Sequence, residues 1–190
     1  GTGCTKGFFS YEEATGRVNI PLDENMTDTL YIPHIAVSDG WWTGLAIANP
    51  NAVNSVKINI KAYTSDGYIT AENIIELGAG ENKTDFIQSY LNNNIIPENT
   101  AWMTLVADGN ITGCLLWGNN SDITNAGVSG ILLMSEKNIA PKLYIPHIAV
   151  GSEWWTGIVL INPGDEISPV TLKGYSSEGN LLQTGKINVA

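Results

Sequence analysis

Alternation of apolar and polar residues dominates this chain and predicts β-strands. Residues 55–63 (SVKINIKAY) carry an apolar side chain at every second position, the pattern of a strand with one buried face. A second alternating run, residues 67–77, follows the turn Ser65-Asp66-Gly67. Asp-Gly between two such runs is a strong hairpin signal. Residues 127–134 are typical of a further strand.

Two other local patterns predict a second hairpin and one helix. Residues 101–107 and 111–118 are strand-like and flank Asp108-Gly109-Asn110, so we expect a hairpin turn at these three residues. Residues 84–92 (TDFIQSYLN) place their apolar side chains on one helical face, with Thr84 as the N-cap. This spacing predicts a short helix.

The chain contains the same twenty-residue phrase twice. YIPHIAVSDGWWTGLAIANP spans Tyr31 to Pro50, and YIPHIAVGSEWWTGIVLINP spans Tyr144 to Pro163, an offset of 113 residues (144 − 31). The match continues with one residue deleted, because AYTSDG at 62–67 aligns with GYSSEG at 174–179. A match of this length indicates duplication of a supersecondary unit.

The repeat predicts how the chain is divided. The tripeptide TGC at 2–4 recurs at 112–114, so the match also extends toward the N-terminus. Residues 30–142 then form one full unit, 143–190 form the head of a second, and 1–29 form a tail. We expect residues 1–29 to complete the second unit by intramolecular packing, because strands left open at an edge promote aggregation.

The fold class follows from these elements. Many short strands with turn signals every 8–12 residues or so predict an all-β fold. We expect two related antiparallel β-sandwich units, Ig-like or jelly-roll-like, with one short helix. The proline within LYIPHIAV, at 30–37 and again at 143–150, implies an edge, a bulge or a bend in that strand.

Composition and charge narrow the choice of partners. The net charge is −10 over 190 residues, and the few Lys and Arg are scattered. Both facts argue against nucleic acid and against an anionic membrane surface, which need clustered positive charge. No apolar run reaches the roughly 18 residues of a membrane span. Scarce Lys and Arg with abundant Asn, Thr, Ser and Gly are typical of secreted or surface proteins.

The two cysteines admit several interpretations. Thr2-Gly3-Cys4 resembles a bacterial lipobox, which would anchor Cys4 to lipid, although no apolar stretch precedes it. No signal peptide is visible either, so we expect a mature form or an excised segment. Cys4 and Cys114 hold matching positions in the two TGC strings. We expect free, buried thiols, with a disulfide between the units as the alternative.

The histidine of the phrase is the first candidate site residue. In a functional interpretation His34 and His147 bind a metal or a sugar. In the structural one, which we favour, each imidazole is hydrogen-bonded inside a corner that follows Pro33 or Pro146. These are the only two histidines, and neither has cysteines or carboxylates at zinc-ligand spacing.

The tryptophan pairs Trp41-Trp42 and Trp154-Trp155 are the second candidate. Adjacent strand residues point to opposite faces, so one ring of each pair should enter the core while the other faces outward. An outward ring would pack against the neighbouring unit, which we favour, or stack on a sugar.

The Asn-Pro dipeptide that closes each copy of the phrase marks the start of a turn. We therefore expect the side chains of Asn49 and Asn162 to bind loop backbone.

Carboxylates are abundant in the predicted loops, where oxygen ligands could hold Ca²⁺. They are Asp39, Asp66, Asp108, Asp122, Glu153, Asp165 and Glu178. No calcium-loop string is present, so we predict no cofactor. G-x-S-x-G, H-E-x-x-H and Walker A motifs are also absent, and we predict no catalytic residue.

The order of short motifs resembles a repeat of bacterial extracellular β-sandwich domains, which recur in multidomain surface proteins. The motifs are the phrase Tyr31 to Pro50, then Tyr63 to Gly67, Leu77 to Lys83, Trp102 to Asp108 and Ile111 to Gly118. The resemblance covers most of the chain. It implies a β-sandwich fold and an extracellular or cell-surface location, and it implies no catalytic chemistry.

These observations lead to three hypotheses of function. We expect a non-catalytic extracellular or cell-surface repeat that serves adhesion, interaction or structural spacing. The alternative is a carbohydrate-binding module that uses exposed Trp, and the second alternative is a fragment of a hydrolase. The expected partner is a glycan or another surface protein.

Overall fold

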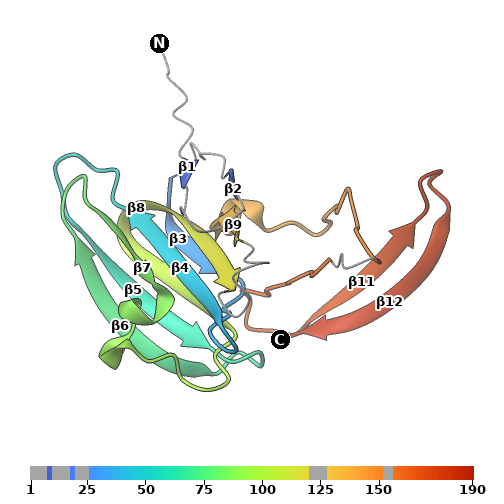
Figure 1. Ribbon diagram of the computed structural model, residues 1–190, viewed down its shortest axis with the longest axis horizontal. Coiled ribbons are helices and arrows are strands. Elements are labelled where there is room, and N and C mark those ends of the chain that lie inside the picture. The colour runs from blue at the N-terminus through green and yellow to red at the C-terminus, as the bar shows by residue number, and fades with distance from the viewer. Residues whose placement is uncertain (1–7, 10–17, 20–25, 120–127, 152–155) are drawn as a thin grey trace, which may run out of the picture.

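The alternating runs form an all-β structure. The computed structural model describes residues 8–9, 18–19, 26–119, 128–151 and 156–190. Its strands make one eight-stranded antiparallel sheet and two two-stranded sheets (Figure 1). The large sheet contains β3 (Thr27–Ile32), β4 (Trp41–Ala48), β5 (Val56–Tyr63), β6 (Ile69–Leu77), β7 (Asn82–Phe86), β8 (Trp102–Asn119), β9 (Val128–Leu132) and β10 (Met134–Ser135). The two small sheets pair β1 (Phe8–Phe9) with β2 (Val18–Asn19), and β11 (Ser168–Tyr175) with β12 (Leu181–Val189).

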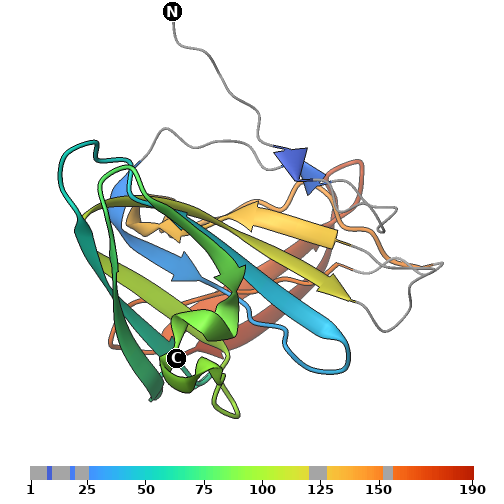
Figure 2. The same ribbon diagram turned by 60° about the vertical axis from the view of Figure 1, so that its left-hand side comes forward.

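Strand β8 organises the large sheet. Its first half lies between β3 and β5, so that Leu105 is opposite Leu30 on one side and Ile60 on the other. Its second half lies between β4 and β9, where Leu115 is opposite Leu45 and Ile131. One strand of 18 residues therefore joins both halves of the sheet. Figure 2 shows the curvature of this long strand.

Both halves of the sheet contribute to one hydrophobic core. The fully buried side chains include Ile32, Leu45, Ile58, Leu105 and Leu115, from β3, β4, β5 and the two halves of β8. The burial of alternate residues along these strands confirms the period-two pattern of the sequence.

The first predicted hairpin is confirmed. Strand β5 pairs with β6 through the turn that contains Gly67, whose φ is +83°. Glycine reaches this left-handed conformation without steric cost. A register shift between Ala62 and Tyr63 marks a bulge next to the turn.

The second predicted hairpin is wrong, because Asp108-Gly109-Asn110 lie inside β8 and make no turn. The Asp108 carboxylate instead accepts a hydrogen bond of 2.8 Å from the backbone N–H of Lys57. Gly109 lies against Val56, and a Cβ added at this glycine would come within 2.8 Å of that side chain. Both residues therefore serve the contact between β8 and the start of β5.

The predicted helix at 84–92 is also wrong. Thr84 to Phe86 belong to β7, which pairs with β4. A 3₁₀ turn, η1 (Ile87–Tyr90), follows at once, and two more are η2 (Asn92–Asn94) and η3 (Glu136–Asn138). No α-helix occurs among the described residues. The apolar side chains of Ile87 and Tyr90 are buried, as the pattern required. The residues before them are extended because they pair with β4.

The hairpin of β11 and β12 has the same register as that of β5 and β6. Tyr63 is opposite Ile69 and Val56 is opposite Leu77, while Tyr175 is opposite Leu181 and Ser168 is opposite Val189. All four positions differ by 112 residues (175 − 63). The bulge recurs between Gly174 and Tyr175, and the turn glycine Gly179 has φ +84°.

The two hairpins differ in their surroundings. Strands β11 and β12 stand apart from the large sheet in Figure 1 and pair only with each other among the described residues. No described residue after Ser135 is buried. The core therefore belongs to residues 30–133, and the C-terminal part adds none.

Candidate functional site

The histidine of the phrase is exposed in both copies. Strand β3 ends at Ile32, and the chain leaves the sheet at the buried Pro33, which agrees with a bend at this proline. The predicted burial of the imidazole is wrong, since both His34 and His147 are exposed. The centroids of the His34 and Trp117 rings lie 6.1 Å apart. The backbone carbonyl oxygen of His34 accepts a hydrogen bond of 3.3 Å from Trp117 Nε1.

The tryptophan pair of the first copy divides between the two faces of β4, as adjacent strand residues must. Trp41 shares the face of the core residues but lies at the strand end, and it is 41% exposed. Trp42 lies on the other face, where it is half-buried and meets Phe86 edge-to-face at 6.1 Å. Neither ring is buried in the core, so the expectation that one ring enters it is wrong for this pair.

Glycines make the space for Trp42. A Cβ built at Gly118 would come within 2.3 Å of the Trp42 ring, and one at Gly44 within 3.4 Å. Gly118 is directly opposite Trp42 on the neighbouring strand. The indole therefore lies across the backbone of β8, in a contact that only glycine allows.

Thr43 and Asn49 hold the phrase together through backbone contacts. Thr43 Oγ1 accepts a hydrogen bond from the N–H of Ala36 at 2.8 Å and donates one to the Ala36 carbonyl at 2.9 Å. The Asn49 side chain is 1% exposed. Its amide nitrogen donates to the carbonyls of Asn54 (2.8 Å), Gly78 (2.9 Å) and Leu77 (3.3 Å), and its oxygen accepts from the N–H of Asn51 (2.9 Å). The predicted role of Asn49 is confirmed.

The second copy of the phrase makes equivalent contacts. Thr156 bonds both backbone groups of Ala149, at 2.9 and 3.0 Å. Asn162 donates to the carbonyls of Glu166 at 2.6 Å and Val189 at 3.3 Å, and accepts from Gly164 at 3.2 Å. Its predicted role is confirmed as well. The pair Trp154-Trp155 lies outside the described residues.

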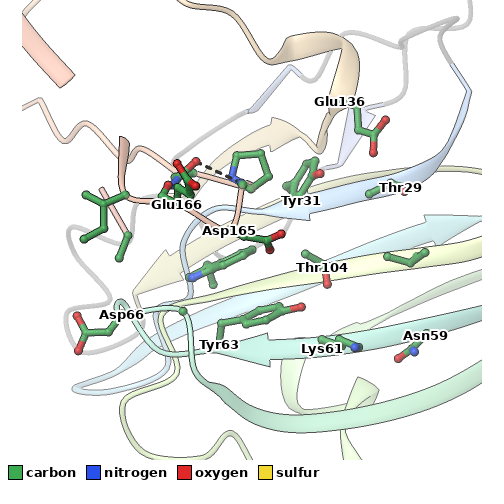
Figure 3. Close-up of a pocket in the computed structure, with 18 residues that line it drawn as sticks. Thr29, Tyr31, Asn59, Lys61, Tyr63, Asp66, Thr104, Glu136, Asp165 and Glu166 are labelled. Atoms are coloured by element: carbon green, nitrogen blue, oxygen red, sulfur yellow. Dashed lines mark hydrogen bonds between the residues drawn. The ribbon is translucent and has the colours of Figure 1, made fainter. Parts of the chain in front are cut away.

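A cleft of about 830 Å³ lies on the face of the large sheet that points away from the core (Figure 3). Alternate residues of β3, β5 and β8 form its floor, among them Tyr31, Lys61 and Thr104. The loop 162–167 borders it on the other side. The cleft therefore brings the Asn-Pro loop of the second copy against the sheet built from the first.

An aromatic pair stands at one end of the cleft. The rings of Tyr63 and Trp102 are stacked, with centroids 4.2 Å apart and an interplanar angle of 13°. These residues are directly opposite each other on β5 and β8. The Trp102 indole N–H donates to the carbonyl of Thr64 at 3.0 Å, which fixes the plane of the pair. Such a platform suits the C–H-rich face of a sugar ring.

The polar groups of the cleft are mixed in charge. Thr104 is 7% exposed, and its buried hydroxyl has no hydrogen-bond partner. The Lys61 ammonium lies 3.2 Å from the Glu72 carboxylate. Burial raises the pKa of the Tyr31 phenol, and the negative charge of Glu136 raises it further. Asp66, Asp165 and Glu166 also line the cleft. The site can donate and accept hydrogen bonds beside an aromatic surface.

The sequence contains a signal for part of the cleft. The run SVKINIKAY places Asn59, Lys61 and Tyr63 together on its polar face, and Trp102 begins a strand. What the sequence does not give is the pairing of β5 with β8, which brings Tyr63 and Trp102 together.

The remaining candidates give no metal site. Within the part of the chain that the structure describes, no group of three or more His, Cys, Asp and Glu is placed to hold a metal ion. Cys114 is a half-buried free thiol, and burial raises its pKa. Cys4 lies outside the described residues. No helix among the described residues has the length and apolar character to cross a membrane.

Comparisons with known proteins add little. No family model matches the chain, and no curated protein matches it. A solved structure, the crystal structure of Thermotoga maritima 1070, is similar over 59% of this chain and 97% of its own, with 13% sequence identity and a TM-score of 0.49. A similarity at this level carries no argument about function.

Proposed function

We propose that this protein is a non-catalytic repeat module of an extracellular or cell-surface protein, which serves adhesion, interaction or structural spacing. One observation carries the proposal: the polar side chains shared by both copies of the phrase bind backbone. Thr43 and Thr156 do so at one position, and Asn49 and Asn162 do so at the other. Side chains that bind backbone stabilise the local fold, so their recurrence supports the use of the same fold in each copy of a repeat.

Each unit in this proposal is a β-sandwich. The long strand β8 supports this idea, because its two halves pair with different strands yet contribute to one core. The position of loop 162–167 on the outer face of the sheet supports a fixed angle between consecutive units. A chain of such units would separate a binding domain from the cell surface by a defined distance.

Small-angle X-ray scattering on chains lengthened by whole units would test the spacing function. One or two further copies of residues 30–142 are inserted after residue 142. A unit of this size has a radius of gyration of about 13 Å, so a sphere of equal radius of gyration is about 35 Å across. We expect the maximum dimension to grow by about this step for each copy.

The same chains with Asn162→Ala are the control, because this change loosens the loop at the junction without touching the core. Their distance distributions should broaden at the same mean step. A maximum dimension that stays constant as units are added would contradict the spacing function.

Glycan binding is the second candidate, and the cleft favours it. The stacked pair Tyr63 and Trp102 lies beside hydrogen-bonding groups in a cleft large enough for a sugar chain. This site differs from the one expected from the sequence, which would use an exposed ring of the pairs Trp41-Trp42 and Trp154-Trp155. A glycan array with Trp102→Ala and Trp41→Ala variants separates the two sites. Loss of one stacking contact should weaken binding by about 3- to 10-fold.

For the cleft, the loss should occur in Trp102→Ala and not in Trp41→Ala. Trp102→Phe should keep most of the affinity, because it retains an aromatic face. If all three variants bind as the parent chain does, the cleft is not the glycan site.

A further inference from the structure

Strand β11 has an open edge where the matching strand β5 has a partner. β5 pairs with β6 on one side and with β8 on the other. β11 pairs with β12 in the same register as β5 with β6, and no other strand of the described residues pairs with it. An open edge presents unpaired N–H and C=O groups to any strand that can complete the ladder.

The apolar side chains that precede this hairpin in the second copy of the phrase are also exposed. Leu30, Ile32, Ile35 and Leu45 are 4%, 0%, 9% and 0% exposed, whereas their counterparts Leu143, Ile145, Ile148 and Ile158 are 62%, 46%, 54% and 45% exposed. On the hairpin itself, Ile60 is 0% exposed and its counterpart Leu172 is 37% exposed. The same residues that build a core in the first copy therefore lack a cover in the second.

Pro169 shows which part of the edge is available. Its counterpart is Lys57 (169 − 57 = 112), whose N–H bonds the Asp108 side chain, while the ladder with β8 begins at Ile58. A proline at this position removes no ladder hydrogen bond and stops pairing beyond it. The edge from Val170 to Tyr175 keeps all its N–H groups.

We propose that β11 accepts an antiparallel strand with the residue pattern of β8, supplied by a further copy of the repeat unit. The proposal rests on the repeat organisation proposed above, and not on the surface location. Two features define the strand. It carries apolar residues at alternate positions, as Met103, Leu105 and Ala107 do, and an aromatic residue opposite Tyr175, as Trp102 is opposite Tyr63.

Other occupants have less support. Strand β3 is held between β8 and β10 on its two sides. Strands β1 and β2 are two residues long each, too short to cover the edge from Val170 to Tyr175. Two copies of this chain each carry a net charge of −10, which opposes self-association through the β11 edge at low ionic strength.

The test uses the full 190-residue chain and a synthetic peptide of residues 101–119 with Cys114→Ser. Calorimetry measures affinity and stoichiometry, and hydrogen exchange measures the amides of Val170 to Tyr175. We expect binding at one peptide per chain. The alternate amides of this segment that point away from β12 should exchange fast in the free chain and slowly in the complex, whereas those that face β12 are protected in both states. Slow exchange of the amides that point away from β12 in the free chain would overturn the proposal, because the edge would already be covered from within the chain.

Matched variants locate the interaction. Leu172→Lys places a charge on the face to be covered and should weaken peptide binding by at least about tenfold. Leu181→Lys makes the same change on the opposite face of the hairpin, where the counterpart Ile69 is 51% exposed in the first copy, and should leave affinity within about twofold. Equal binding by Leu172→Lys and the parent chain overturns the proposal.

A peptide control tests the pattern of the strand. Replacing Met103 and Leu105 of the peptide by Lys should abolish binding, because both side chains would face the new core. Binding of this control at parental affinity overturns the proposal. If the peptide does not bind but the maximum dimension from scattering grows by the same step with each added unit, the open edge alone is rejected. If the peptide binds but the maximum dimension does not grow as units are added, the spacing function alone is rejected.

Discussion

The buried amide of Asn49 offers a measurable test of how the phrase stabilises the fold. Replacing it with alanine removes four hydrogen bonds to backbone groups, three of them shorter than 3.0 Å. Each such bond contributes about 1 kcal/mol net, and a buried group left without a partner costs about 1–3 kcal/mol. Because Leu77 is 1% exposed, its carbonyl cannot turn to water. We expect Asn49→Ala to lower the free energy of unfolding by about 3–4 kcal/mol.

The second copy provides an internal control. Asn162 makes matching bonds, but two of its three contacts lie at the surface, where water can replace the lost partner. Asn162→Ala should therefore cost less than about 1 kcal/mol. The two variants share the substitution and the local motif, and differ mainly in burial.

Urea denaturation followed by tryptophan fluorescence and far-ultraviolet circular dichroism measures both costs. The slope of the free energy against urea should stay constant, so that the shift in midpoint reports stability alone. If Asn49→Ala and Asn162→Ala lose equal stability, or if Asn49→Ala costs less than about 1 kcal/mol, the reasoning from burial is refuted.

Two further predictions concern Trp42 and Tyr90. Gly118→Ala should lower the free energy of unfolding by about 1–3 kcal/mol and shift Trp42 emission, because the new methyl group overlaps the indole. The control is Gly174→Ala, where an added Cβ meets nothing within 4 Å. Equal stability of the two variants would contradict the contact between Gly118 and Trp42. Burial, and then the charge of Asp85, raises the pKa of Tyr90, so the folded state keeps its proton above pH 10 while the unfolded state loses it. Stability should therefore fall as pH rises above about 10, with a slope of up to about 1.4 kcal/mol per pH unit. Denaturation from pH 8 to 11.5 should show a shallower fall for Tyr90→Phe, and parallel curves would refute the assignment.

Features that depend only on residues close together in the chain could be predicted from the sequence. Asp66-Gly67 marks a real turn, and the alternation in 55–63 places the correct side chains in the core. The Asn-Pro dipeptides predicted backbone-bound amides because the hydrogen-bond partners of Asn49 include its own loop: Asn54 accepts a bond from it and Asn51 donates one to it.

Long-range pairing explains what the sequence could not give. Asp108-Gly109 satisfies the same signal as Asp66-Gly67, yet it lies within β8 because Lys57 and Val56 take up its side-chain bond and its free space. Thr84 to Phe86 are extended because β4 pairs with them. The cleft depends on β5 meeting β8, a contact between residues about 40 positions apart.

The central place of β8 has a consequence for synthesis of the chain. Leu30 is paired on β8 with Leu105, and Thr43 with Trp117. Both partners are synthesised more than 70 residues later (105 − 30 and 117 − 43). Pairings of this sequence separation form slowly, because loop closure comes before the contacts that reward it. We therefore expect the nascent chain to emerge from the ribosome with β3 unpaired and with β4 able to pair only with β7, and to close cooperatively only after Asn119 has left the exit tunnel.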